Sequence, residues 1–321
     1  MHVAMESGNA RTEGACMNFD HLIALSERYA AKYSGKSEGL PGLFILRKET
    51  VSSFEAVIYQ PVICLILQGA KETFVGDQGA RLQAGDALLV SHDVPVVSRI
   101  TKASATEPYL ALILSLDLAL VRSLYERVGE ALPPADRARS LSAAPADPAW
   151  IDPLGRYLAM MDRPLDARVL GPAVLREVHY RLLMSPIGGM LRNLLSIDSH
   201  ASRIARAILR IRADFRAPLA VSELARTAGM SPSSFHDHFK SVTGTTPLQY
   251  QKDLRLIEAR GLLADGRQPV SAVAFAVGYE SPTHFSRDYS RKFGRPPSRD
   301  TPNAGPRPGG PIGLGVGAPM L

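Results

Sequence analysis

The chain has 321 residues, of which 45% are hydrophobic and 21% are charged, which is typical of a soluble protein with about two globular domains. Its two cysteines, Cys16 and Cys64, are too few for a disulfide framework, and their spacing suits no metal site. Residues 1–20 contain no apolar run like a secretory signal, and no stretch approaches the ~18 consecutive apolar residues of a membrane helix. The composition therefore excludes disulfide-rich secreted and membrane-spanning classes, and we expect a cytoplasmic protein.

The basic residues are concentrated in the last third of the chain. The formal net charge is +6, and residues 198–300 alone hold 16 basic and 10 acidic side chains, which accounts for the whole excess. A local basic excess is expected of a domain that binds a polyanion, although a basic surface with no such function is about as common. Residues 198–300 are therefore the candidate nucleic-acid-binding domain.

Residues 40–131 are predicted to form a β domain. Short runs rich in β-branched and aliphatic residues alternate there with glycine and proline turns, at positions 43–49, 54–60, 62–69, 71–76, 86–91, 94–100 and 109–117. Many short strands at this spacing favour a sandwich or barrel. The preceding segment, residues 1–39, is expected to be partly flexible.

After the β domain the pattern changes to helical periodicity. Apolar residues recur at helical spacing in three segments, 152–161, 167–184 and 187–196. Residues 132–150 are expected to be a linker, so that 132–197 forms a linker followed by a helical region. The apolar stripes of these helices suit a dimer interface or a packed core equally well. The Gly/Pro-rich tail, residues 301–321, is expected to be disordered.

One sequence pattern occurs twice in the C-terminal third. SPSSFHDHFKSVTGTTP (231–247) and SPTHFSRDYSRKFGRPP (281–297) share S-P-x2-F-x3-[FY]-x4-G-x2-P in register. Each has the signals of a complete helix, because serine caps the first turn, proline suits the first helical position and glycine suits the end. A short apolar-faced helix and a glycine precede each copy, in VSELARTAG (221–229) and VSAVAFAVG (270–278). The sequence therefore predicts an all-α domain with two helix-turn-helix units.

The second helix of each unit is predicted to have a core face and a polar face. The residues predicted to form the helix-turn-helix cores are Leu224, Ala225, Gly229, Phe235 and Phe239, and Ala274, Gly278, Phe285 and Tyr289. Those predicted to bind DNA are Ser233, His236, Asp237 and Lys240, and Thr283, Ser286, Arg287, Ser290 and Arg291. Such side chains hydrogen-bond base edges, with arginine suited to guanine and aspartate to cytosine. One helix of this kind is more often an ordinary solvated surface, but two copies in matching frames favour DNA binding.

The segment between the units, residues 247–266, is predicted to be a single amphipathic helix. Its apolar stripe is expected to contain Tyr250, Leu254, Ile257 and Gly261. About 18 residues at 1.5 Å each span roughly 27 Å, and successive major-groove segments on one side of B-DNA lie roughly 34 Å apart. One chain could therefore place both second helices in adjacent groove segments. Phosphate contacts are expected from Lys240, Arg255, Arg291 and Lys292.

These residues resemble the AraC/XylS family of bacterial transcription regulators, whose DNA-binding domain has two helix-turn-helix units joined by a linker helix. The likeness covers roughly residues 200–298 and is most specific in AVGYESPTHFSRDYSRKFGRPP, with LRLIEARGLL in support. Residues 40–195 also look like the amino-terminal domain of one subgroup, through PVICLILQGAKETFVGD, AGDALLVSHDVPVVSRI and LREVHYRLLMSPIGGMLRNLL.

The resemblance implies a cupin-like N-terminal domain that binds a small-molecule effector or forms a homodimer, with double-stranded DNA and RNA polymerase as partners. The positions at which the family contacts bases correspond here to Ser233, His236 and Asp237 in the first unit, and to Thr283, Ser286 and Arg287 in the second. Relatives tend to carry a basic residue where this chain has Asp237, and another where it has Gly261. Because an acidic group near phosphates lowers affinity, the first unit is expected to bind more weakly or to prefer cytosine.

Two other classes of function stay open from the residues alone. A cupin-type enzyme that modifies a small molecule needs a convergent cluster of catalytic or metal-binding side chains, but His92, followed by Asp93, is the only histidine in residues 43–116. We therefore expect His92 to be structural and Cys64 to be a buried small hydrophobe, and we predict no enzyme activity, metal or cofactor. The other alternative is a helical module whose repeat packs against a protein partner.

Overall fold

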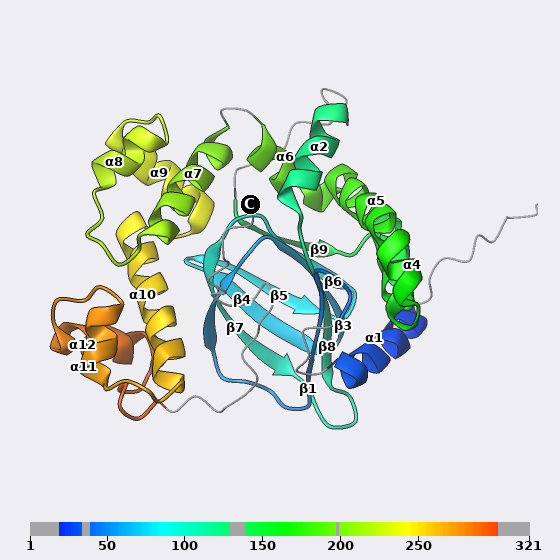
Figure 1. The fold of residues 1–321 in the computed structure, drawn as a ribbon, viewed down its shortest axis with the longest axis horizontal. Coiled ribbons are helices and arrows are strands. Elements are labelled where there is room, and N and C mark those ends of the chain that lie inside the picture. The colour runs from blue at the N-terminus through cyan, green and yellow to red at the C-terminus, as the bar shows by residue number, and fades with distance from the viewer. Residues whose placement is uncertain (1–18, 34–38, 129–138, 197–198, 301–321) are drawn as a thin grey trace, which may run out of the picture.

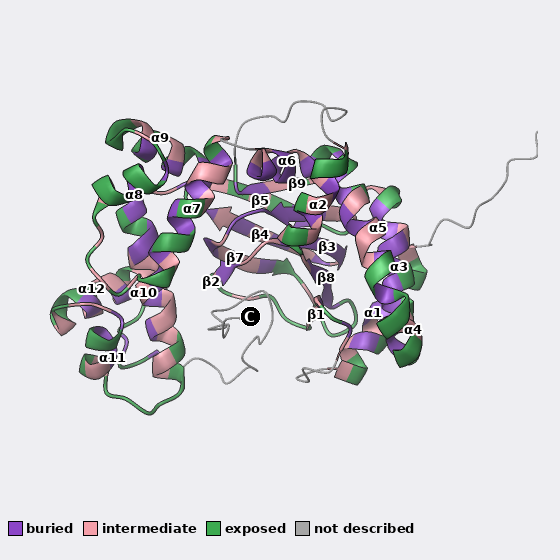
Figure 2. Ribbon diagram, turned by 45° about the horizontal axis from the view of Figure 1, so that its top comes forward, coloured by how far each residue is buried: buried purple, intermediate pink, exposed green. Residues whose placement is uncertain are grey.

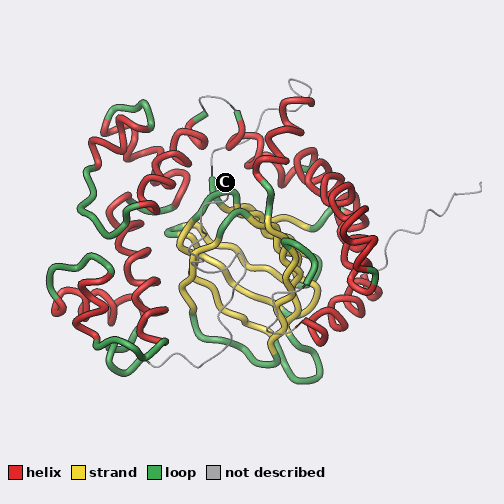
Figure 3. Tube along the Cα trace, viewed as in Figure 1, coloured by secondary structure: helices red, strands yellow, loops and turns green. Residues whose placement is uncertain are grey.

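A β domain lies at the centre of the molecule with helices on both sides of it, as Figures 1 and 3 show. The computed structural model describes residues 19–33, 39–128, 139–196 and 199–300. The helices of residues 148–184 lie on one side of the β domain, and those of residues 200–293 lie on the other. Residues 1–18 of the N-terminal segment and the tail predicted to be disordered lie outside the described residues.

The β domain consists of two antiparallel sheets. Its strands are β1 (Leu43–Lys48), β2 (Glu55–Tyr59), β3 (Val62–Gln68), β4 (Ala70–Val75), β5 (Gln78–Gln83), β6 (Asp86–Val90), β7 (Val94–Lys102), β8 (Tyr109–Ser115) and β9 (Leu141–Pro145). The five-stranded sheet has the order β1-β8-β3-β6-β9, and the four-stranded sheet has the order β2-β7-β4-β5. The predicted fold class is confirmed: it was α+β, with a cupin-like β-barrel followed by helices and then an all-α domain of two helix-turn-helix units. The two sheets are hydrogen-bonded separately and do not close into one continuous barrel.

Strand β3 shows why the β domain has two apolar cores. Its sequence, VICLILQ, is buried on both faces, as expected of a strand covered on both sides. Because successive side chains alternate between faces, Ile63 and Leu65 pack with the helices of residues 19–195. Cys64 and Ile66 face the four-stranded sheet and join the core that extends to the C-terminal helices.

Six helices cover the outer face of the five-stranded sheet and its ends. They are α1 (Phe19–Tyr33), α2 (Leu118–Val128), α3 (Pro148–Ala159), α4 (Pro164–Val169), α5 (Gly171–Met184) and α6 (Gly189–Leu195). Leu22 of α1, Trp150 and Leu154 of α3 and Leu182 of α5 are buried together in the first core. Full burial of side chains of this size stabilises the fold by about 1.5–3 kcal/mol each.

Three elements of this half were not predicted. Helix α1 lies in the segment that was expected to be partly flexible, and it packs on β1 through Leu22 and Leu25. The segment expected to be a linker contains β9, which pairs antiparallel with β6. Its sequence, LSAAP, has little intrinsic preference for a strand, so its pairing at the sheet edge makes it one. Strand β5 forms because the two-residue turn at Gly76–Asp77 folds it back on β4.

The described residues of the C-terminal part form helices joined by loops, without a strand. Its helices are α7 (His200–Ala213), α8 (Val221–Thr227), α9 (Pro232–Thr243), α10 (Pro247–Ala264), α11 (Val270–Ala276) and α12 (Pro282–Phe293). Figure 2 shows them buried along their inner faces and exposed along their outer faces. The second core runs without interruption from between the sheets into α7, α8, α9 and the first half of α10. Within the described parts of the chain, no helix combines the length and apolarity that crossing a bilayer requires.

Candidate DNA-binding surface

The two helix-turn-helix units are built by the same local signals. The hydroxyls of Ser231 and Ser281 cap α9 and α12 by accepting hydrogen bonds from the backbone N–H groups of Ser234 and His284. Each helix has a proline at its first position and ends at a left-handed glycine, Gly244 with φ 68° and Gly294 with φ 72°. The repeated sequence therefore produces a repeated structure.

The apolar residues predicted for the two units lie in two separate cores. In the first unit Leu224, Ala225, Phe235 and Phe239 are buried, and in the second Ala274, Phe285 and Tyr289 are buried. Gly229 and Gly278 make the turns, with φ of 65° and 90°. Any side chain at Gly278 would also collide with the backbone carbonyl of Arg216. The first core continues into the β domain, whereas the second is formed by the second unit and α10 alone.

The structure exposes most of the side chains predicted to contact DNA. On α9, Ser233, His236, Asp237 and Lys240 are exposed, and on α12, Thr283, Arg287 and Arg291 are exposed. Ser286 and Ser290 are half-buried, and the Ser290 hydroxyl donates a 2.8 Å hydrogen bond to the Ser286 carbonyl. The His238 ring does not join this exposed set, because it stacks on His200 of α7 with the ring centroids 3.5 Å apart.

The linker helix α10 has 18 residues, as predicted, but its buried residues do not form the single stripe that we expected. Tyr250 and Leu254 enter the first core, while Leu256 and Ala259 enter the core of the second unit. Gly261 is exposed. At about 100° per residue, Leu254 and Leu256 point to nearly opposite sides of a helix. The helix therefore holds the first unit with one face and the second unit with another.

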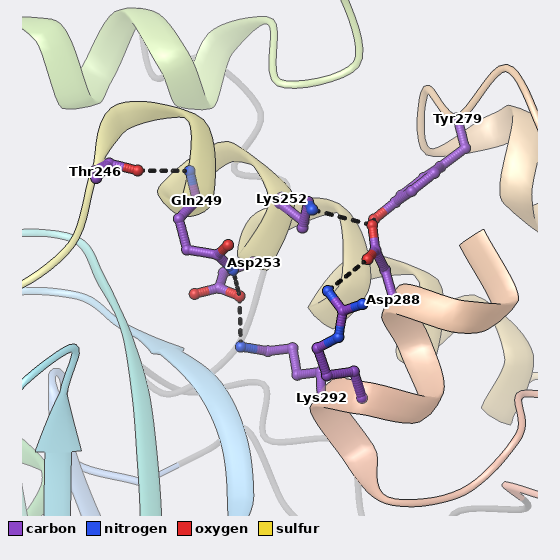
Figure 4. Close-up of polar contacts among 8 residues, drawn as sticks. Thr246, Gln249, Lys252, Asp253, Tyr279, Asp288 and Lys292 are labelled. Carbon is purple, nitrogen blue, oxygen red and sulfur yellow. Dashed lines mark hydrogen bonds and ion pairs between the residues drawn. The ribbon is translucent and has the colours of Figure 1, made fainter. Parts of the chain in front are cut away.

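Two ion pairs fix α12 on α10, as Figure 4 shows. Lys252 lies 3.1 Å from Asp288, and Lys292 lies 2.7 Å from Asp253. The second pair is largely buried, with side-chain exposures of 13% and 15%. Lys292 therefore pairs with Asp253 inside the domain and is not available for the phosphate contact that we expected. The Tyr279 hydroxyl also donates to Asp288 at 3.3 Å, and Gln249 donates to Asp253 at 3.0 Å.

Arg255 likewise forms hydrogen bonds within the protein, and it does not have the free guanidinium group that the expected phosphate contact requires. Its guanidinium donates hydrogen bonds of 2.7–2.9 Å to the carbonyls of Phe215, Arg216 and Ala217, which lie in the loop between α7 and α8. Charge-assisted bonds of this kind are strong. Arg255 therefore ties the linker helix to the start of the first unit, and Lys240 and Arg291 are the exposed members of the predicted phosphate-binding set.

The C-terminal end of the second unit is anchored by Asp300. The carboxylate is fully buried, accepts a 2.9 Å hydrogen bond from the Tyr289 hydroxyl and lies 3.0 Å from Arg260 of α10. Neither this anchor nor the ion pairs of α12 could be predicted, because the partners are far apart in the chain and no local pattern signals them. The basic and acidic residues were visible, but their pairing was not.

The turn between β4 and β5 touches the end of α9. The backbone N–H of Asp77 donates to the Gly244 carbonyl at 3.4 Å, and the Gln78 amide donates to the Ser241 carbonyl at 3.0 Å. The backbone N–H of Ser140, just before β9, donates to the Val242 carbonyl at 3.0 Å. These bonds satisfy carbonyls that a helix end leaves without partners. The β domain is therefore in direct contact with α9, the second helix of the first helix-turn-helix unit.

His92 and Asp93 form a second contact between the β domain and the C-terminal helices. His92 is buried, with Nδ1 2.8 Å from the Ser91 hydroxyl and Nε2 3.2 Å from the Ala201 carbonyl of α7. Asp93 pairs with Arg212 of α7, and its backbone carbonyl accepts a 2.6 Å hydrogen bond from the Tyr250 hydroxyl. Burial lowers the pKa of His92 to about 4, so the ring is neutral near pH 7. Across the described residues, no cluster of three or more potential metal ligands is present.

A cupin-like β domain followed by two helix-turn-helix units on a shared helix is an architecture typical of two-domain DNA-binding proteins. Residues 39–190 match the family model for the AraC-type transcriptional regulator N-terminus, and residues 224–301 match a helix-turn-helix domain model. The chain belongs to the AraC/XylS family of transcriptional regulators.

Known relatives match this chain over part of their length. The probable transcriptional regulator LumQ of Photobacterium leiognathi is 38% identical over 25% of this chain and 33% of its own. The RCS-specific transcriptional activator RclR of Escherichia coli (strain K12) is 32% identical over 36% of this chain and 35% of its own. The matches thus span about a third of each relative.

The solved structure of wild-type ToxT from Vibrio cholerae strain SCE256, with an unsaturated fatty acid bound, has the same fold. The two superpose with a TM-score of 0.51 over 80% of this chain and 92% of ToxT, at 14% sequence identity. At that identity the likeness concerns the fold alone.

Proposed function

We propose that this protein binds duplex DNA sequence-specifically through α9 and α12 and regulates transcription in response to a small molecule bound by its N-terminal domain. The observation that carries the proposal is the pair of matched recognition helices on one linker helix. Both present exposed polar side chains, and α12 is held on α10 by two ion pairs. A rigid spacer of this length suits two neighbouring major-groove segments.

The proposal is tested by selecting bound sequences from random duplexes with the full chain and footprinting the selected DNA with hydroxyl radicals. Two protected major-groove segments about one helical turn apart are expected for one chain on the DNA. Substitutions on α12 should alter protection in one segment, and substitutions on α9 should alter it in the other. A single protected segment, or no duplex binding at low salt, would contradict the proposal.

Arg287 is the exposed α12 side chain best suited to a guanine contact. The Arg287→Ala variant is expected to lose about 1–3 kcal/mol of binding free energy and its preference at one base pair. Fluorescence anisotropy on the selected duplex and its single-base variants measures both effects. Arg163→Ala, which removes an exposed arginine beside α4 on the far side of the molecule, is the matched control. If the wild type and the Arg287 variant bound with equal affinity and equal base preference, Arg287 would not contact the DNA.

Lys240 is proposed to contact a phosphate. The Lys240→Ala variant should weaken binding to all sequences alike, because phosphates carry no base information. The slope of log K against log salt concentration should fall by about 1. Titrations at several salt concentrations check this prediction, and a loss confined to one sequence would instead indicate a base contact.

The proposal includes RNA polymerase and a second copy of the chain as partners. Self-association is supported by three apolar side chains on and directly after α4, Leu165, Val169 and Leu170, which are all more than half exposed. Sedimentation of the wild-type chain and of a variant with these residues changed to serine tests the homodimer. Measuring transcription in vitro with added RNA polymerase tests the polymerase as a partner.

A further inference from the structure

Strand β4 carries a lysine on the face between the two sheets. Side chains of β4 alternate, so Lys71, Thr73 and Val75 point inward, and Lys71 is only 5% exposed. They project into the second core, which contains aliphatic side chains such as Ile66, Leu88 and Ile100. A lysine is almost never buried in such surroundings unless it is paired. Among the residues that the structure describes, no carboxylate forms an ion pair with Lys71.

The polar groups near Lys71 are hydroxyls and a thiol. Its ammonium nitrogen lies 3.4 Å from the Tyr59 hydroxyl and 3.9 Å from the Cys64 sulfur. Within the described residues, the buried hydroxyl of Thr73 has no hydrogen-bond partner, and that of Tyr109 has none within 3.5 Å. Burial raises the pKa of the Cys64 thiol and of the Tyr109 hydroxyl, so neither supplies a negative charge. The site therefore combines an ammonium group with several hydroxyls, and among the described residues it contains no carboxylate to accept from them.

These side chains lie beside the corner where the chain passes from one sheet to the other. Gly69, with φ 79°, joins β3 to β4 and packs against the backbone of Tyr109. The strand registers shift on both sides of this corner, between Ile66 and Gln68 in β3 and between Ala70 and Lys71 in β4. Such irregularities commonly occur next to binding sites, where they redirect a side chain.

We propose that Tyr59, Lys71, Thr73 and Tyr109, here called the Lys71 cluster, bind the carboxylate of a small aliphatic acid that acts as the effector. This inference rests on the proposed function, because it names the ligand class of the sensing domain. A carboxylate is acceptor-only and forms charge-assisted hydrogen bonds with an ammonium group and hydroxyls. Its hydrocarbon chain would lie against Ile66, Leu88 and Ile100, whose side chains are buried in the same core. A dianion with no apolar part would be poorly matched to these walls.

The position of the cluster connects it to the first recognition helix. Lys71 and Thr73 lie on β4, and the same strand ends at the Gly76–Asp77 turn that bonds to the end of α9. Lys71 and Gly76 are separated by five residues of extended chain, which is about 17 Å. A ligand that shifts β4 at the Lys71 cluster therefore acts on one short strand whose other end touches α9.

The test measures hexanoate binding to the full chain, with 1-hexanol and hexylamine as matched probes that lack the carboxylate. Equilibrium dialysis of radiolabelled hexanoate should show one site per chain, and hexanoate should raise the Tm by at least about 2 °C. The two matched probes should leave the Tm unchanged. Lys71→Met should abolish binding, whereas Lys102→Met, which removes an exposed lysine of β7, should keep it.

A second measurement separates binding from folding. Without ligand, Lys71→Met should melt at or above the wild-type Tm, because an apolar side chain replaces a buried charge that has no counter-ion. It should also bind the selected DNA as the wild type does. The proposal is overturned if hexanoate fails to bind, if the alcohol or amine binds equally, if the Lys71 variant keeps hexanoate binding, or if that variant melts well below the wild type. Each of these outcomes leaves the DNA-binding proposal standing, since that proposal fails only when the wild type protects a single groove segment or does not bind duplex DNA at low salt.

Discussion

Replacing Asp300 by alanine is expected to destabilise the second helix-turn-helix unit by about 3 kcal/mol. The substitution leaves the Tyr289 hydroxyl without its partner and removes the buried counter-ion of Arg260. The second unit has a small core of its own, so it should open locally while the β domain and the first unit stay folded. DNA binding should fall because α12 is no longer held in place.

Native-state hydrogen exchange measures this local effect directly. Protection of amides in α11 and α12 should drop about 100-fold, while protection in the β domain should be unchanged. Footprinting should lose the groove segment assigned to α12 and keep that of α9. The matched control is Ser298→Ala, which changes an exposed neighbour of Asp300. Wild-type protection in α12 of the Asp300 variant would show that the anchor contributes little.

The contact between the β domain and α7 is expected to weaken as the pH falls below neutrality. Burial lowers the pKa of His92 to about 4, whereas an unfolded histidine titrates near 6.5. Between these two values the unfolded chain binds a proton that the folded chain does not, so stability is lost as the pH falls. His92 alone should reduce the free energy of unfolding by about 2 kcal/mol between pH 7 and pH 5.

Comparison of wild type with His92→Gln isolates this contribution. Glutamine can still donate to the Ala201 carbonyl, but it does not titrate, so the slope of stability against pH should be smaller in the variant. His284→Gln, which removes an exposed histidine from α12, is the matched control. Chemical denaturation from pH 5 to pH 7 provides the measurement. Equal slopes for wild type and His92→Gln would mean that His92 is not held neutral by the fold.

The recognition helices show how much local sequence determines. Ser231 and Ser281, the following prolines, and Gly244 and Gly294 act within one helix each, through caps and backbone conformation. Phe235 and Phe239 repeat at helical spacing, so the core face and the exposed face follow from the pattern alone. Residues whose effect is local were therefore predictable, and so was the likeness between the two units.

Lys292 and Arg255 show what the sequence alone left undecided. Both were expected to contact phosphates. Lys292 instead pairs with Asp253, and Arg255 donates hydrogen bonds to the carbonyls of residues 215–217. A charge can pair inside the protein or remain free for DNA, and only the three-dimensional arrangement of distant residues decides between these outcomes. Strand β9 became a strand for a similar reason, because β6 lies beside it.

The sequence by itself determined the kinds of domain, the order in which they occur and the exposed polar faces of α9 and α12, since these depend on neighbours a few residues apart. The tertiary structure decided that α10 holds the two units with different faces, that β4 reaches the end of α9, and that Lys71 is buried with no described carboxylate paired to it. These features depend on contacts between segments tens to hundreds of residues apart, and periodicity and local preference carry no information about such contacts.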